Sequence, residues 1–281
     1  MAIPILKNWK NYFTNRDEGL GSSYERIVLN QKLESICHHF KVETILEAPC
    51  FGFTGLSGIN SAHLARKGCK VSLLDDNEER ISMIIDLWEE LKIPLEITFS
   101  PKFNKIPFED KSFDFSWNFS ALWFVEDLEI FLEELTRATS KVILLCVPNR
   151  TGLGYTIQKK IGKEDLKTYL REKNIYPKNI KKIMMNLDWL LIDNKYIDCP
   201  PWPDIGMPKE KFLKIFGLSE LAGKQRKEPL SIMDYYSGKT PDFPDKMMKY
   251  YWFEKNIPAF IKMFWAHHKY FLFIPKGKNE K

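Results

Sequence analysis

Residues 45–61, ILEAPCFGFTGLSGINS, place three glycines three residues apart directly after an apolar run that ends in an acid. The residues that follow, AHLARKG, have a helical pattern. A strand, a glycine-rich turn and a helix in this order are typical of nucleotide-binding α/β folds. Because several unrelated chemistries share this unit, the rest of the chain must decide which nucleotide it binds.

Apolar runs alternate with amphipathic helical patterns from about residue 41 to residue 150. This alternation predicts an α/β fold with a doubly wound, mostly parallel sheet that helices cover on both faces. The predicted strands are ETILEA, CKVSLLDD, LEITFS, a run within KSFDFSWNFSALWF, and KVILLCVP, and the predicted helices are GINSAHLARKG, NEERISMIIDLWEELK and DLEIFLEELTRA.

The sequence predicts three parts. Residues 1–40 form a helical lid segment, in which Ser22 or Ser23 is expected to cap the main helix. Residues 41–150 form the cofactor-binding core. Residues 151–281 contribute the late strands of the same sheet, LLIDNKYIDCP and KYFLFIP, with a helical substrate cap inserted between them.

Charge and composition limit the classes of partner and the compartment that we expect for this protein. The chain has 42 basic and 37 acidic residues with both signs interspersed, so we expect no nucleic-acid partner. It shows no secretory pattern and no apolar run long enough to cross a bilayer. Its five cysteines are scattered, as in reducing compartments. We therefore expect a cytoplasmic protein without a transmembrane segment.

An acid ends the second predicted strand. Asp75 is placed to accept hydrogen bonds from the two hydroxyls of a ribose, because ligands of such sheets lie at the carboxyl ends of the strands. The alternative is that Asp75, Asp76 and Asn77 only form a turn and a helix cap.

Across about residues 40–150, the chain resembles class I S-adenosylmethionine-dependent methyltransferases. Three features carry the resemblance: the acid and turn of residues 47–55, the strand-terminal Asp75, and residues 106–124, IPFEDKSFDFSWNFSALWF. Within the last, PFEDKSFD is the most specific match. The resemblance implies a seven-stranded sheet and S-adenosylmethionine as the cofactor.

The resemblance also implies where the cofactor lies. Glu47 would hold the methionine ammonium, the turn would line the methionine and ribose, and Asp75 would hold the ribose. Phe103 is a candidate to stack on adenine, with packing as the alternative, and Tyr24 is a candidate to close over the cofactor. The full predicted cofactor set is Tyr24, Glu47, Pro49, Phe51, Gly52, Thr54, Gly55, Asp75, Asp76, Phe103, Asn118 and Phe119.

The sequence departs from the family pattern at two places. Pro49 and Phe51 stand where the family commonly has glycine. The acid often found after the third strand is missing, and Lys102, Phe103 and Asn104 occupy that region.

The acceptor is expected to be a small molecule, and its pocket to include Trp123, Asn149, Tyr155 and Trp202. The aromatic runs YYWF and FIKMFW favour an apolar or aromatic acceptor, such as a lipid or a quinone, with core packing as the alternative. Contact of this late segment with a membrane surface is a further alternative. Methyl transfer needs positioning and desolvation more than a special catalytic group, and no catalytic base is assigned.

Two other functions compete. The segment FTGLSGIN and the pairs Tyr155–Lys159 and Tyr169–Lys173 resemble NAD(P)-dependent short-chain dehydrogenases. A methyltransferase-like scaffold without catalysis is the other alternative. No metal is expected, because the adjacent histidines of each pair, such as His267 and His268, point in different directions and form no chelating face.

Overall fold

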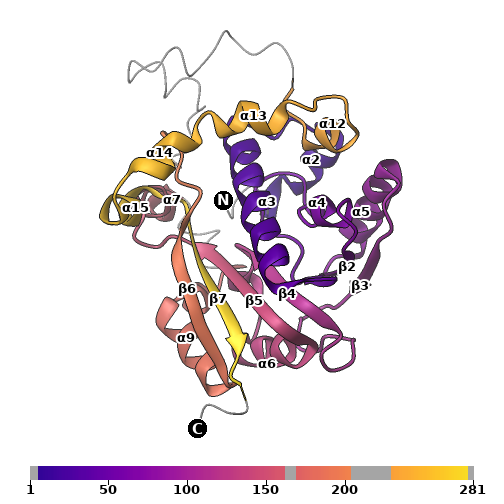
Figure 1. Ribbon diagram of the computed structural model, residues 1–281, viewed down its shortest axis with the longest axis vertical. Coiled ribbons are helices and arrows are strands. Elements are labelled where there is room, and N and C mark those ends of the chain that lie inside the picture. The colour runs from indigo at the N-terminus through magenta and orange to yellow at the C-terminus, as the bar shows by residue number, and fades with distance from the viewer. Residues whose placement is uncertain (1–5, 162–168, 204–228, 278–281) are drawn as a thin grey trace.

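The computed structural model describes residues 6–161, 169–203 and 229–277. Its centre is a seven-stranded sheet in the order β3-β2-β1-β4-β5-β7-β6 (Figure 1). The five strands β1 to β5 pair in parallel, and β7 runs antiparallel to its neighbours β5 and β6. The strands are β1 (Thr44–Glu47), β2 (Lys70–Asp75), β3 (Glu96–Phe99), β4 (Phe113–Phe119), β5 (Thr139–Pro148), β6 (Trp189–Ile197) and β7 (His268–Pro275).

Alternate strand residues enter two separate apolar cores. In β5, Leu144 packs into the core on the α3 and α5 side of the sheet, and Leu145 packs into the core that contains α6 and α9. This alternation follows from the two-residue period of a strand. Helices therefore cover both faces, and the predicted doubly wound α/β fold is confirmed.

The helices predicted over NEERISMIIDLWEELK and DLEIFLEELTRA are present, but the one predicted over residues 58–68 is reduced to Ala62–Ala65, because the residues before it continue the turn. Within the described residues the helices are α2 (Trp9–Thr14), α3 (Gly19–Phe40), α4 (Ala62–Ala65), α5 (Glu78–Leu91), η1 (Leu122–Phe124), α6 (Leu128–Ala138), α7 (Leu153–Ile161), η2 (Glu172–Ile175), α9 (Pro177–Asn186), α12 (Ile232–Tyr236), α13 (Phe243–Met248), α14 (Tyr251–Asn256) and α15 (Ala259–Trp265). None of the helices among these residues is long and apolar enough to cross a membrane.

The start of α3 corrects one prediction. The helix begins at Gly19, so Ser22 and Ser23 lie inside its first turns and neither caps it. Asp17 instead accepts a hydrogen bond from the backbone N–H of Gly19 at 3.0 Å. Glu18, at the cap position, directs its carboxylate toward the glycine turn, where it accepts from the N–H of Leu56.

The N-terminal helix and the late helices pack together above the sheet. In Figure 1, α12 and α13 pass across the end of α3. Asn30 of α3 donates to the hydroxyl of Tyr236 of α12 at 3.1 Å, and the N–H of Glu18 donates to Leu230. Residues at the two ends of the chain thus surround the carboxyl edge of the strands.

Candidate active site

The glycine turn after β1 packs directly on the end of β4. Gly52 has φ +123°, and a Cβ there would overlap the backbone carbonyl of Phe119. A Cβ on Gly55 would lie 2.6 Å from a carboxylate oxygen of Glu18. Glycine is therefore required at position 52 both by the backbone conformation and by the close approach of two chain segments.

Glu47 lies at the end of β1 and is buried. Its carboxylate accepts hydrogen bonds from the Asn60 amide at 3.0 Å, the Ser61 N–H at 3.2 Å and the Ser61 hydroxyl at 2.7 Å. Burial raises the pKa of Glu47 to about 7, and the hydrogen bonds from Ser61 and Asn60 oppose that rise. Near neutral pH, the Glu47 side chain is therefore present both as the carboxylate and as the protonated carboxyl group.

Asp75, at the end of β2, is fully buried and paired with Arg80. The guanidinium Nε lies 2.8 Å and 3.1 Å from the two carboxylate oxygens, and Nη2 lies 2.6 Å from one of them. The same guanidinium stacks 4.1 Å from the centre of the Phe51 ring. The acid predicted to bind ribose is therefore held by an arginine in this structure.

The structure also contains the turn and the helix cap that were the alternative role for residues 75–77. Asn77 caps α5 by accepting from the N–H of Arg80 at 2.9 Å, and Asp75 accepts from the N–H of Asn77. Asp76 pairs with Arg80 at 2.7 Å. These bonds orient Arg80 toward the strand end, because its own helix starts there.

Asn118 and Phe119 end β4. Among the described residues, neither the oxygen nor the nitrogen of the Asn118 amide has a hydrogen-bond partner, although the side chain is fully buried. Such groups are costly unless something binds them. Glu47, Asp75 and Asn118 come from β1, β2 and β4 and reach the same edge of the sheet.

The aromatic members of the predicted set fill the space beside Asp75. Phe103 is buried and lies 5.9 Å from Phe51 and 6.4 Å from Phe131 between ring centres, so here it packs in the core. Pro49 is buried and Thr54 is partly exposed in the turn.

The predicted acceptor-side residues separate into different regions. Tyr24 lies 5.8 Å from Trp202 between ring centres, and its hydroxyl donates to Glu254 at 2.9 Å. Asn149 donates to the carbonyls of Met263 and Ala266 at the end of α15.

The remaining two lie on the far side of the sheet. Trp123 belongs to the core that contains α6 and α9, and Tyr155 packs against it. Tyr155 donates to Glu172 at 2.6 Å, and Lys159 pairs with the same carboxylate at 2.7 Å. Burial and the Glu172 carboxylate raise the pKa of Tyr155, whereas a dehydrogenase would need a lowered one.

Sequence reasoning missed a buried ion pair behind the glycine turn. Arg26 of α3 is fully buried, contacts both carboxylate oxygens of Glu18 and donates to the carbonyl of Leu56 at 3.0 Å. Its guanidinium also lies 4.0 Å from the centre of the Phe53 ring. Charged residues in a helix are usually solvated, so nothing local distinguishes Arg26.

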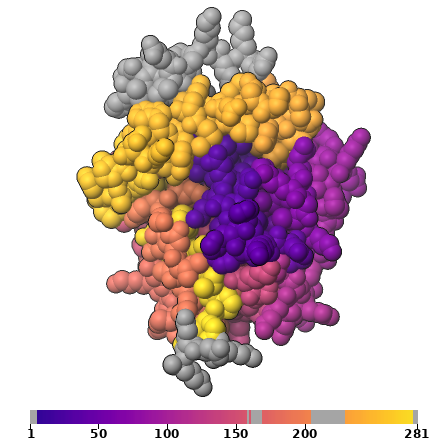
Figure 2. Space-filling view, viewed as in Figure 1, coloured from indigo at the N-terminus to yellow at the C-terminus, as the bar shows by residue number. Residues whose placement is uncertain are grey.

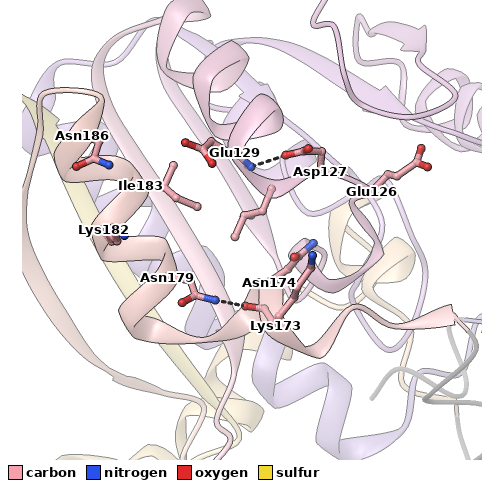
Figure 3. A pocket seen from close by; sticks show the side chains of 10 residues that line it. Glu126, Asp127, Glu129, Lys173, Asn174, Asn179, Lys182, Ile183 and Asn186 are labelled. Atoms are coloured by element: carbon pink, nitrogen blue, oxygen red, sulfur yellow. Dashed lines mark hydrogen bonds between the residues drawn. The ribbon is translucent and has the colours of Figure 1, made fainter.

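A cavity of about 390 Å³ lies between the start of α6, η2 and α9 (Figure 3). Asp127 accepts from the N–H of Glu129, and Asn179 donates to the carbonyl of Lys173. The residues that line the cavity are Glu126, Asp127, Leu128, Glu129, Lys173, Asn174, Asn179, Lys182, Ile183 and Asn186. None of the predicted cofactor or acceptor residues is among them. The cavity is separate from the candidate active site.

The residues at the strand ends fit S-adenosylmethionine in chemical kind. Glu47 suits an ammonium, Asp75 suits paired hydroxyls, and the amide of Asn118 has both its donor and its acceptor unused. The fit requires that Arg80 give up hydrogen bonds to Asp75, because it occupies the oxygens that a ribose would use.

Fold and site together define an α/β protein of the class I methyltransferase type. The methyltransferase domain family model matches residues 53–143, which begin just after Gly52 and contain Gly55, Asp75 and the end of β4. This match supports a methyltransferase domain in the chain with S-adenosylmethionine as its cofactor. The dehydrogenase alternative loses its support.

Solved structures agree on the fold. An S-adenosylmethionine-dependent methyltransferase from Clostridium acetobutylicum is 8% identical, with TM-score 0.52, over 90% of this chain and 92% of that one. One from Archaeoglobus fulgidus is 14% identical, with TM-score 0.51, over 89% and 94%. The MccD protein is 14% identical, with TM-score 0.52, over 88% and 96%. No curated protein sequence matches the chain.

Proposed function

We propose that this methyltransferase acts on a small molecule with an apolar or aromatic body, such as a lipid, a quinone or a related metabolite. The aromatic cluster of Tyr24, Trp202 and Tyr250 carries this proposal. Trp202 lies 5.0 Å from Tyr250 and 5.8 Å from Tyr24 between ring centres, all in edge-on geometry. Aromatic edges and faces in this arrangement favour a planar or apolar ligand.

The cluster lies beside the expected position of the methyl group. Tyr24 precedes Glu25, whose carboxylate pairs with His268 at 2.9 Å. The His268 ring lies 4.4 Å from that of Phe119, the last residue of β4. Residues that resemble the family's methionine contacts thus adjoin the aromatic cluster.

In this proposal the cofactor supplies an activated methyl group, and the chain positions both reactants. Glu47 holds the ammonium, Asp75 the ribose hydroxyls, and Asn118 the methionine portion. Pro49, Phe51, Gly52, Thr54 and Gly55 line the cofactor through the turn, with Asp76, Phe103 and Phe119 at its borders. Alignment and exclusion of water then account for most of the rate gain.

The outer surface supports an apolar acceptor. Three large side chains of α14 and α15 are exposed: Trp252, Phe260 and Phe264 are 45%, 66% and 51% exposed. In Figure 2 these helices, in yellow, project at one side of the molecule. The core-packing alternative holds for Tyr250, which is buried, and for Trp265, which packs against the same core, but not for these three exposed side chains. Contact with a membrane surface is part of the proposal.

The proposed organisation keeps three parts: residues 1–40 as a lid, 41–150 as the cofactor core, and 151–281 as late strands with the acceptor cap. A cytoplasmic location is proposed because all five cysteines are free thiols.

Transfer of a tritium-labelled methyl group tests the acceptor class. We expect label to enter phenols, quinols or lipids, and expect Trp202→Ala to reduce transfer at least about tenfold, as loss of a buried aromatic contact does. Trp189→Ala, at a buried tryptophan in the core on the other side of the sheet, is the matched control. Transfer confined to polar amines or to macromolecules would contradict the proposal, and cofactor binding without any transfer would favour the scaffold alternative.

Cofactor binding should depend on the ionisation of Glu47. Because the pKa of Glu47 is about 7, its carboxyl is largely protonated at lower pH and then attracts an ammonium weakly. We expect the affinity for S-adenosylhomocysteine, measured by calorimetry, to rise up to about tenfold per pH unit below that pKa and then to level.

Glu47→Gln should bind weakly and remove this pH dependence. Stability changes in the opposite direction, since a raised carboxyl pKa contributes stability at low pH that is lost as pH rises through about 7. An unchanged pH profile in Glu47→Gln would show that another group titrates.

A further inference from the structure

A buried group of titratable side chains lies beside the end of β4 and has no part in cofactor binding. Glu25 comes from α3, Asp198 follows β6, and His268 begins β7, and all three are at most 7% exposed. One ligand atom from each lies within 4.8 Å of the others. Three distant parts of the chain thus bring an imidazole and two carboxylates to one point.

We propose that Glu25, Asp198 and His268 form a binding site for a divalent metal ion, with Zn²⁺ or Mn²⁺ as its occupant. One imidazole nitrogen and two carboxylate oxygens are a ligand set that these ions accept. The site goes beyond the proposed function and does not depend on the identity of the acceptor.

The spacing of the ligand atoms suits such an ion. His268 Nδ1 lies 2.9 Å from Glu25 Oε1 and 3.6 Å from Asp198 Oδ2. Ligands about 2.0–2.2 Å from a tetrahedral zinc ion lie about 3.3–3.6 Å from one another. Small side-chain movements would therefore convert the present ion pairs into a coordination sphere.

Unused hydrogen-bonding atoms point to a missing ligand. Among the described residues, Asp198 Oδ1 has no hydrogen-bond partner, although Asp198 is only 2% exposed. His268 Nδ1 is at ion-pair distance from Glu25, yet it also has no hydrogen bond of proper geometry within the described chain. Buried polar atoms are seldom left unsatisfied, and a cation would satisfy both.

Surrounding residues support the ligands as in known metal sites. Asp198 Oδ2 lies 2.7 Å from Nδ1 of His267, a contact that fixes the orientation of this carboxylate. The Phe119 ring packs against His268 on the side of β4. A site with three protein ligands leaves a position for water or for an oxygen of the acceptor, next to the transferred methyl group.

Charge favours a divalent ion at this place. Two ionised carboxylates balance its charge in a region that water does not reach. Metal binding to Nδ1 requires the lone pair of that nitrogen, so the ion competes with protons for the site.

Metal binding can be measured on the full chain without any acceptor. Protein stripped with a chelator is titrated with Mn²⁺ and with Zn²⁺ in two buffers of different ionisation enthalpy. We expect about one ion per chain, with the same stoichiometry in both buffers. Glu25→Gln and His268→Gln should each bind at least about tenfold more weakly, as loss of one ligand implies.

Glu34→Gln is the matched control, because Glu34 forms a similar pair with His63 at 3.1 Å on an exposed part of the surface. Glu34→Gln should bind like the wild type. The proposal is overturned if the wild type binds no ion, or if Glu25→Gln and Glu34→Gln bind equally. Since the number of bound ions is measured on the wild type, a variant that fails to fold leaves the test intact.

Discussion

Asp75→Ala is expected to abolish measurable binding of S-adenosylmethionine and to lower the free energy of unfolding by about 3–5 kcal/mol. Asp75 is fully buried, and Arg80 is held by both of its oxygens. Removal of the carboxylate leaves a buried guanidinium that keeps Asp76 as its acidic partner among the described residues. The ribose would lose its proposed acceptor in the same step. Calorimetry and urea denaturation measure the two effects.

A double variant separates these effects. Asp75→Ala with Arg80→Leu removes both charges, so most of the stability should return while the cofactor still fails to bind. Asp86→Ala, at an exposed acid of the same helix, should change neither quantity. Retained affinity in a folded Asp75→Ala protein would show that the ribose is bound elsewhere.

Arg26→Met is expected to destabilise the protein by about 3–5 kcal/mol, because Glu18 would stay buried without its counter-charge. Glu18 also accepts the N–H of Leu56 at 2.8 Å, and Arg26 donates to the carbonyl of the same residue. The pair therefore holds the glycine turn on α3. We expect weaker cofactor binding as well, since the turn loses this support.

Arg16→Met is the matched control for this prediction. Its side chain is 37% exposed and pairs with Glu90 at the surface, where such pairs contribute about 0–1 kcal/mol. Equal losses of stability in the two variants, measured by denaturant unfolding, would mean that burial of Arg26 does not carry the effect.

Local patterns in the sequence predicted the sheet and the ends of its strands. β1 and β2 lie where apolar runs end in Glu47 and Asp75, and Asn118 lies one residue before the end of β4, because burial on both faces requires such runs. Their common edge follows from parallel pairing. The helix cap at Asn77 was also predictable, since a cap depends on neighbouring residues only.

Charged side chains inside the fold were not predictable in this way. From the sequence, Arg80 is expected to be an exposed residue of a helix. In the structure it lies at the start of α5, where its guanidinium binds Asp75 and packs over the ring of Phe51. The cap expected at Ser22 or Ser23 failed because the helix extends back to Gly19.

The sequence by itself therefore determined the class of fold, the match of residues 53–143 to a methyltransferase domain and the strand ends at which the cofactor is expected. Only the tertiary structure decided what lies around them. The adjacent histidines predicted no metal, since neighbours in the chain diverge. The pairing of β7 with β6 and the packing of α3 nevertheless bring His268 to Asp198 and Glu25. Such contacts depend on the assembled sheet, and no local period encodes them.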